Sequence, residues 1–326
     1  MAGFERLIGL LADGSFHSGE EIGQQLQVSR AAVWKQLQKL SELGLSVESL
    51  KGKGYRLAKR IELLDRELIE SELAAPVASH LRPLDIAFDI DSTSGRALSR
   101  LSLAEVGKGY VCLAERQTGG RGRRGRQWVS PFGCNLYLSL VWEFESGAAA
   151  LEGLSLLVGI ATVRTLIGFG FESVKLKWPN DILLDGKKLG GILLEMTGDP
   201  SGRCHVVVGI GLNVDMSTEG GAIDQPWAAL SQFKPVISRN RLAAALLNEL
   251  VPLLATYSST GFAVYVDEWR GLDAYLNCPV KVMSGDKQVV GISRGVADNG
   301  ALLLAVDGQE QRVYGGELSL RLHDDS

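Results

Sequence analysis

Apolar residues recur every three or four positions in three successive segments near the start of the chain, and this spacing predicts three short helices. The second helix should begin at Ser18, because Glu21 three residues later completes a capping box. The third should end at Gly44, a residue type that accepts the left-handed conformation common after a helix. The apolar positions that define the first and third helices are Phe4, Leu7, Ile8, Leu11, Val33, Leu37, Leu40 and Leu43.

A predicted hairpin follows these helices. Residues 45–50 and 55–57 are strand-like, and lysines alternate with glycines in the turn between them. Residues 46–60 hold five basic side chains and one acid, which suits a wing that lies along DNA phosphates. Residues 1–60 are therefore predicted to form a winged helix-turn-helix domain, although such a domain can instead serve protein interaction or dimerisation. The candidate DNA contacts are Ser29, Arg30, Lys35, Lys51, Lys53 and Arg56.

The middle of the chain has a mixed pattern. After a linker at residues 58–64, strand-like runs alternate with helical stretches, which predicts an α/β domain around a mixed sheet over residues 65–275. The tail changes to short β-rich runs, and we expect residues 276–326 to form a small barrel resembling an SH3 fold. The fold class is thus α/β multidomain. The expected helices lie at 65–75, 151–169, 239–257 and 261–275, and the expected tail strands at 280–284, 288–296, 301–306 and 311–313.

Composition and charge refine this division. The 326 residues are 45% hydrophobic and 22% charged, which is ordinary for a soluble globular protein of two or three domains. The net charge of −4 conceals an asymmetry, because residues 1–60 hold nine basic and six acidic side chains while the remainder is acidic overall. A basic N-terminal segment joined to an acidic remainder suggests that the N-terminal segment has a separate function.

Several classes of protein are disfavoured by what the sequence lacks. It contains no CxxC pair, and its cysteines are far apart, so we expect neither a zinc site nor a disulfide framework. The N-terminus does not resemble a signal peptide, and no stretch approaches eighteen uncharged apolar residues. We therefore expect a cytoplasmic protein with no membrane partner. The scattered histidines are interpreted as structural or exposed.

One loop concentrates the candidate chemistry. Residues 119–126, GGRGRRGR, combine bare backbone N–H groups, which can form an anion-binding concavity, with guanidinium groups that fork onto phosphate or carboxylate. A disordered Arg/Gly tail for nucleic acid is the alternative. However, the Gly/Arg run occurs only once, and it lies between the strand-like segments 110–114 and 135–142. We therefore interpret it as a loop of a folded domain that binds phosphate, here called a phosphate clamp.

Two further motifs follow the loop in order. Residues 177–181 are KWPND, and residues 188–193 are KLGGIL. With the GRGRRG loop, these segments resemble the biotin protein ligase family, and the flanking domains extend the likeness to the bifunctional bacterial form that is also the biotin operon repressor. Other matching segments are 91–93, 130–133, 135–137 and 209–213.

The resemblance implies a reaction. The biotin carboxylate attacks the α-phosphate of ATP, giving biotinyl-5′-adenylate and pyrophosphate, and the biotinyl group then passes to a lysine of a biotin carboxyl carrier protein. Such a site needs fixed cations more than a nucleophilic side chain. Lys188 matches the family lysine beside the biotin carboxylate, and Arg123 is the second catalytic candidate.

The resemblance also implies residues for each substrate. Ser94 stands where the family commonly has asparagine, so its contact is open. Asp181 is either a tentative Mg ligand or a structural residue of a turn. Trp128 and Trp227 either contact the adenine ring or are part of the hydrophobic core. The biotin set is Ser92, Thr93, Ser94, Gln117, Arg121, Gly122, Arg123 and Lys188, and the nucleotide set is Gly120, Arg121, Arg124, Trp128, Lys177, Asn180, Asn213 and Trp227.

The implied partners are the biotin carboxyl carrier protein, operator DNA, and a second copy of the chain when biotinyl-adenylate is bound. Two alternatives stay open at this point. One is a transcription regulator that has lost catalysis, which the intact Lys188 and Arg123 disfavour. The other is a lipoate ligase, which the winged front and the β-rich tail disfavour.

Overall fold

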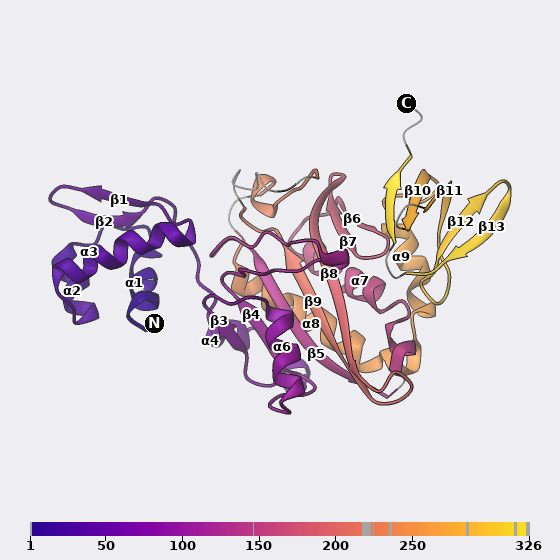
Figure 1. The fold of residues 1–326 in the computed structure, drawn as a ribbon, viewed down its shortest axis with the longest axis horizontal. Coiled ribbons are helices and arrows are strands. Elements are labelled where there is room, and N and C mark those ends of the chain that lie inside the picture. Colours follow the sequence, from indigo (N-terminus) through magenta and orange to yellow (C-terminus); the bar gives the residue numbers. More distant parts are fainter. Residues whose placement is uncertain are drawn as a thin grey trace.

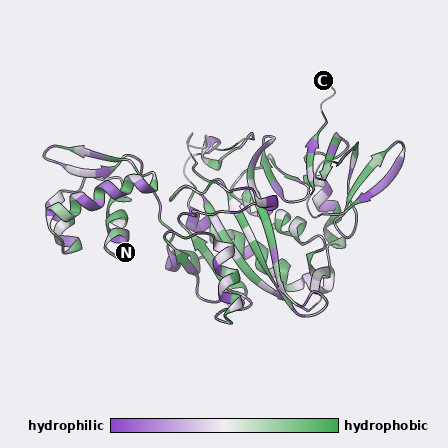
Figure 2. Cartoon of the chain, in the orientation of Figure 1, coloured by the Kyte–Doolittle hydropathy of each residue, from purple (hydrophilic) through white to green (hydrophobic). Residues whose placement is uncertain are grey.

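The computed structural model describes residues 2–145, 147–216, 223, 225–234, 237–284, 287–315 and 318–323. Figure 1 shows three parts in chain order: small helices and a hairpin at one end, a large sheet with its helices in the middle, and a small sheet at the other end. Apolar residues concentrate in the central strands and the helices packed on them (Figure 2).

The N-terminal part has the predicted helices and hairpin. The Ser18 side chain caps α2 by accepting a hydrogen bond from the Glu21 N–H at 3.1 Å, which is one of the two bonds of the predicted capping box. After the third helix a 3₁₀ turn ends at Gly44, whose φ is 75°. The elements are α1 (Ala2–Leu11), α2 (Gly19–Leu26), α3 (Arg30–Lys39), η1 (Leu40–Leu43), β1 (Val47–Leu50) and β2 (Gly54–Leu57).

The linker after the hairpin is fixed to the middle part by a buried ion pair. Arg239, 3% exposed, lies 2.7 Å from the carboxylate of Glu115, and the same carboxylate accepts the Leu64 N–H. Glu62 accepts from the Ser238 hydroxyl at 2.6 Å. In addition, Phe132 of the middle part packs into the core of the helical part. The segment predicted as a linker therefore docks on the central domain.

The central sheet is mixed, as predicted. Its strand order is β3-β4-β5-β9-β8-β7-β6, with β3 and β4 parallel and the other neighbours antiparallel. One face packs on α7 and α8 and the other on α6, because residues alternate between the faces of a strand. The strands are β3 (Asp85–Ala87), β4 (Val111–Ala114), β5 (Leu136–Phe144), β6 (Val174–Lys177), β7 (Asp181–Leu184), β8 (Lys187–Gly198) and β9 (Cys204–Leu212).

Two predicted helices are shorter than expected. The helix at 65–75 ends early, and a new turn begins near Pro76, which is favoured at the start of a helix. The helix at 261–275 forms only as a 3₁₀ turn and a short helix. The helices and turns are α4 (Arg66–Ser71), α5 (Ala75–Ala78), α6 (Thr93–Ser102), η2 (Arg123–Gly125), η3 (Gly147–Leu151), α7 (Leu154–Gly168), η4 (Leu230–Gln232), α8 (Arg239–Thr260), η5 (Ala263–Tyr265) and α9 (Val266–Leu272).

Helix α8 is long and apolar enough to cross a membrane by composition alone. More than half of its apolar window is buried inside the protein, as in the core helix of a globular domain. Pro252 lies inside it without ending it.

The C-terminal part is a five-stranded antiparallel sheet, and the predicted SH3-like barrel is not confirmed. The order β13-β12-β11-β10-β14 leaves β13 and β14 as open edges among the described residues. Closure requires pairing between the first and last strands, which a pattern of short strands and turns does not encode. The strands are β10 (Pro279–Ser284), β11 (Lys287–Val296), β12 (Leu302–Val306), β13 (Gln309–Val313) and β14 (Ser319–Leu322).

Candidate active site and DNA-binding surface

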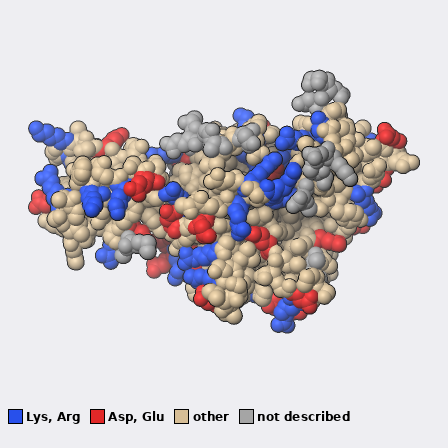
Figure 3. Space-filling model, in the orientation of Figure 1, with Lys and Arg blue, Asp and Glu red and all other residues tan. Residues whose placement is uncertain are grey.

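A cavity of about 680 Å³ opens over the central sheet. Strands β5, β8 and β9 supply its apolar floor, the β6–β7 hairpin supplies one wall, and the Gly/Arg loop and β14 supply the others. Figure 3 shows Lys and Arg side chains gathered on this face near the middle of the molecule. The loop arginines Arg121, Arg124 and Arg126 are exposed at the cavity.

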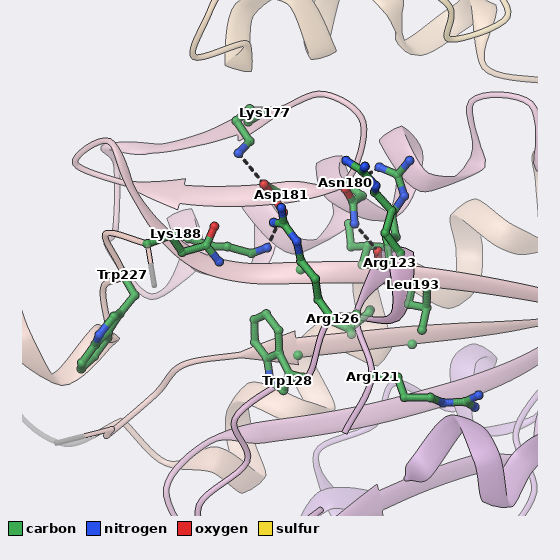
Figure 4. Close-up of a pocket in the computed structure, with 18 of the residues that line it drawn as sticks. Arg121, Arg123, Arg126, Trp128, Lys177, Asn180, Asp181, Lys188, Leu193 and Trp227 are labelled. Atoms are coloured by element: carbon green, nitrogen blue, oxygen red, sulfur yellow. Dashed lines mark hydrogen bonds and ion pairs between the residues drawn. The ribbon is translucent and has the colours of Figure 1, made fainter. Parts of the chain in front are cut away.

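One carboxylate holds two lysines at the polar end of the cavity. The oxygens of Asp181 lie 2.6 Å from Lys177 Nζ and 2.7 Å from Lys188 Nζ (Figure 4). Burial alone would raise the pKa of Asp181, but the two ammonium groups outweigh it and leave this pKa below its ordinary value. The carboxylate therefore stays ionised and fixes both cations in position.

Arg123 reaches this end from the loop. Its guanidinium donates to the Asn180 side-chain oxygen at 2.9 Å and to the Leu318 carbonyl at 3.3 Å. Burial lowers the pKa of Arg123, and the nearby Asp181 opposes that shift. One side chain thus joins the loop, the β6–β7 connection and the start of the last strand.

The loop is tied back to the floor of the cavity. Its two arms pair through Gly122 N–H and Arg126 C=O at 2.7 Å. A Cβ at Gly211 would lie 2.7 Å from the Trp128 ring, so the bare backbone of β9 is what admits that ring. Lys188 Nζ lies 5.6 Å from the centre of the same ring, and the buried indole Nε1 of Trp128 is without a hydrogen-bond partner among the described residues.

The opposite end of the cavity is polar, and its only charged lining side chain among the described residues is Arg121, which pairs with Glu195 at 3.3 Å. Gln117 accepts from the Thr93 N–H at 2.9 Å and from its hydroxyl at 3.2 Å. The Ser94 and Ser139 hydroxyls are 3.0 Å apart, and Ser139 donates to the Thr93 hydroxyl at 2.8 Å. Ser92 caps α6, its hydroxyl accepting the Gly95 N–H at 3.3 Å. A cavity with mainly neutral donors and acceptors at one end and cations at the other suits a polar neutral group joined to an anion.

The structure brings almost all the predicted site residues to this cavity. Gly120 is the exception: it does not line the cavity, and a Cβ there would meet the Trp128 carbonyl at 2.7 Å. Asn213 lines the cavity, but its side-chain amide donates to the Ala228 carbonyl at 3.0 Å. The predicted residues at the cavity are Ser92, Thr93, Ser94, Gln117, Arg121, Gly122, Arg123, Arg124, Trp128, Lys177, Asn180, Asp181, Lys188, Asn213 and Trp227.

Two of the groups of lining residues that sequence reasoning missed are informative. The first is the apolar floor, which includes Leu138, Leu193 and Ile210, and strand alternation could have pointed to it. The second comes from 318–322 near the C-terminus, which contacts the loop only through tertiary folding. No local signal marks that second group.

The predicted DNA contacts lie in the other domain. Ser29 uses its hydroxyl as the cap of α3, accepting the Ala32 N–H at 3.3 Å. Arg56 is paired with Glu48 at 2.7 Å and lies over the Phe16 ring, so its charge is partly satisfied within the wing. Arg30, Lys35, Lys51 and Lys53 are exposed.

No group of three or more His, Cys, Asp or Glu able to hold a metal occurs among the described residues. Both oxygens of Asp181 already face ammonium groups, and Arg123 adds positive charge nearby. Like charges repel, so the described side chains do not fit a metal ion held by the protein at this carboxylate.

Comparison with known proteins assigns all three parts. Residues 5–56 match an HTH domain model, 87–213 the biotin/lipoate A/B protein ligase family, and 275–321 the biotin protein ligase C-terminal domain. The chain is 44% identical to the bifunctional ligase/repressor BirA of Salmonella typhimurium over 97% of this chain and 96% of that protein. It is 35% identical to the biotin–[acetyl-CoA-carboxylase] ligase of Paracoccus denitrificans over 70% of this chain and 96% of that protein.

A solved structure supports the same relationship. The biotin protein ligase from Aquifex aeolicus in complex with biotin and ATP superposes with a TM-score of 0.65 at 28% identity, covering 74% of this chain and 99% of that one.

Proposed function

The chain belongs to the family of bifunctional biotin protein ligases and repressors, and we propose that its cavity joins biotin to ATP and its winged domain binds operator DNA. The protein forms biotinyl-5′-adenylate and transfers the biotinyl group to a lysine of a biotin carboxyl carrier protein. The observation that supports this most is the placement of Lys188, Lys177 and Arg123 together at one end of the cavity.

In the first step a biotin carboxylate oxygen bonds to the α-phosphorus of ATP while the bond to the β-phosphate oxygen breaks, and pyrophosphate leaves. Negative charge gathers around phosphorus during this exchange, and preorganised cations stabilise it. Lys188 stabilises that charge, and Arg123 holds the product. In the second step the carrier amine attacks the acyl carbon, loses a proton, and AMP leaves.

The end of the cavity opposite the two lysines is proposed to bind the biotin head group. Ser92, Thr93, Ser94 and Gln117 offer hydroxyl and amide groups for the ureido ring, and the apolar floor suits the sulfur ring and chain. Ser94 stands in a restricted place, because a Cβ at Gly209 would lie 2.8 Å from its hydroxyl oxygen.

The nucleotide is proposed to lie beside Trp128, Trp227 and Arg124, with the adenine near the indole rings and Lys177 and Asn180 near phosphate. Arg121 was also expected at the nucleotide, but it pairs with Glu195 at 3.3 Å and lies beside the Ser92 end of the cavity. Mg²⁺ was expected with ATP. Since Asp181 already binds two lysines, we assign no ligand and no step to a metal ion held by the protein.

The repressor half is proposed to be a ligand-linked homodimer. A helix-turn-helix offers a single recognition helix, and operators read by such domains are usually two-fold, so tight binding needs two copies. We propose that biotinyl-adenylate tightens self-association by about 1 to 3 kcal/mol, a usual allosteric coupling. Equal association constants by sedimentation with and without biotin and ATP would contradict this.

We also propose that the protein is cytoplasmic and that its C-terminal sheet is an SH3-like barrel. The four cysteines are free thiols, which is ordinary in a reducing cytoplasm. The C-terminal sheet has the five short antiparallel strands of an SH3-like fold, although its edges are open among the described residues.

The test of the ligase is direct. The full chain is incubated with ATP, magnesium and either biotin or lipoate, and the adenylate is sought by mass spectrometry. Biotinyl-adenylate with pyrophosphate release is the expected result. Lipoyl-adenylate alone would make the protein a lipoate ligase, and no adenylate from either acid would leave a DNA-binding regulator.

A further inference from the structure

Helix α3 has two unlike faces. Val33 and Leu37 are buried in the core of the winged domain. At about 100° per residue, Lys35 lies opposite this buried face and Trp34 lies on its flank, roughly 80° from the middle of the buried face. Arg30 starts the helix nearer the buried side, and all three side chains are exposed. Trp34 stands between the two cations on this arc.

The exposure of Trp34 is unusual within this chain. Its exposed fraction is 57%, whereas Trp142, Trp178 and Trp269 are 2% or less exposed. All six tryptophans lie in the described part of the chain, and the remaining two line the cavity. A single exposed apolar side chain is ordinary on a protein surface, so it is the combination of Trp34 with the cations of an acid-free helix that points to a partner here.

We infer that Trp34 contacts base edges in the major groove and that its ring packs on a thymine methyl group. This inference rests on the proposed repressor function. The first turns of a recognition helix lie against base edges, and thymine is the base that presents a methyl group in the major groove. The residue is absent from the DNA contacts predicted above, because apolar side chains carry no phosphate-binding signal.

The charges around Trp34 favour duplex DNA as the occupant of this face. Helix α3 contains arginine and lysine and no acidic residue. Beyond it, the wing places Lys51 and Lys53 beside Leu50, which is 46% exposed. Phosphates complement this set, whereas the same face of a second copy would meet it with like charge. The cations position the domain and the tryptophan supplies sequence preference.

The experiment uses the full chain with biotin and ATP. A pool of duplexes with a randomised centre is passed through rounds of binding, the preferred sequence is recovered, and each of its thymines is replaced in turn by deoxyuridine. Removing a methyl group that Trp34 covers should weaken wild-type binding about fourfold at one or two positions. Trp34→Ala should bind the preferred duplex at least about tenfold more weakly, and replacing thymine by deoxyuridine should no longer weaken its binding. Trp34→Phe should keep part of the affinity and part of the deoxyuridine effect.

Controls separate this inference from the function on which it rests. Leu103→Ala, at an apolar side chain 66% exposed outside the winged domain, should leave DNA binding unchanged. Trp34→Ala should also keep wild-type adenylate formation and binding to unrelated duplex within about twofold, since phosphate contacts supply non-specific affinity.

A preferred duplex that wild type and Trp34→Ala bind equally, or an equal deoxyuridine effect in both, would overturn the role of Trp34 and leave the repressor function standing. Weaker self-association in Trp34→Ala with intact DNA binding would assign the face to a second copy instead. If no preferred sequence emerges, both the repressor function and the inference fail.

Discussion

Lys188 and Lys177 make a matched pair for testing the proposed chemistry. Each lysine has 17% of its side chain exposed, and they lie 2.7 Å and 2.6 Å from the same carboxylate, that of Asp181. Replacing either by methionine removes one ammonium group and leaves the other partner in place. Any difference between the two variants therefore reports what each cation does beyond holding Asp181.

The expected effects on stability are similar. Each variant loses one charge-assisted hydrogen bond in a largely buried place, which costs about 1.5 to 3 kcal/mol of unfolding free energy. The pKa of Asp181 lies below its ordinary value in the folded protein, so this carboxylate stabilises the fold above its unfolded pKa and loses that effect as the pH falls through its folded pKa. Urea unfolding at pH 7 thus compares each variant with a wild type in which Asp181 is ionised.

The expected effects on adenylate formation differ. Loss of one preorganised charge partner typically costs about 10² to 10³ in rate, or about 2.7 to 4 kcal/mol, and we expect this for Lys188→Met. Lys188 Nζ lies within 5.6 Å of the Trp128 ring, on the side of the Gly/Arg loop, whereas Lys177 reaches Asp181 from the hairpin wall (Figure 4). Lys177→Met should mainly raise the KM for ATP, by about tenfold.

The assay is a single-turnover reaction with saturating biotin and ATP, quenched and quantified for biotinyl-adenylate by mass spectrometry. A Lys188→Met rate within about threefold of wild type would remove this lysine from the chemical step. Equal rate losses in both variants would mean that the Asp181 cluster matters only as a unit.

Further predictions concern the loop, the wing and a buried acid. Arg123→Gly deletes the donor to Asn180 and to the Leu318 carbonyl, so biotinyl-adenylate should escape faster and label bystander lysines; unlabelled bystanders would contradict the clamp. Neutralising Lys51, Lys53 and Arg56 should flatten the salt dependence of DNA binding by about 0.9 per lost phosphate contact, with biotinylation unchanged. Burial raises the pKa of Asp273 to about 6, so its ionisation destabilises the fold as pH rises through that range, and Asp273→Asn should gain up to about 3 kcal/mol over wild type between pH 4 and 7 in urea unfolding.

Local patterns in the sequence determined much of this protein. Helical spacing and the capping pair Ser18 and Glu21 encode the winged domain, since such signals act within one turn of chain. The Gly/Arg loop and the KWPND and KLGGIL segments indicated the cavity and its charged side chains, because their chemistry depends on residue type and short spacing.

Other features were decided by tertiary structure alone. Arg123 meets a carbonyl 195 residues away, and the linker is held by Arg239 and Glu115, which are 124 residues apart. The sequence also suggested Asp181 as a metal ligand, whereas folding surrounds it with two ammonium groups that occupy its oxygens. Local sequence patterns also could not predict which strands form the edges of the C-terminal sheet. Periodicity states which face of an element is buried, but which distant groups meet there is set by how the elements pack, and that packing fixes the charge each site residue meets.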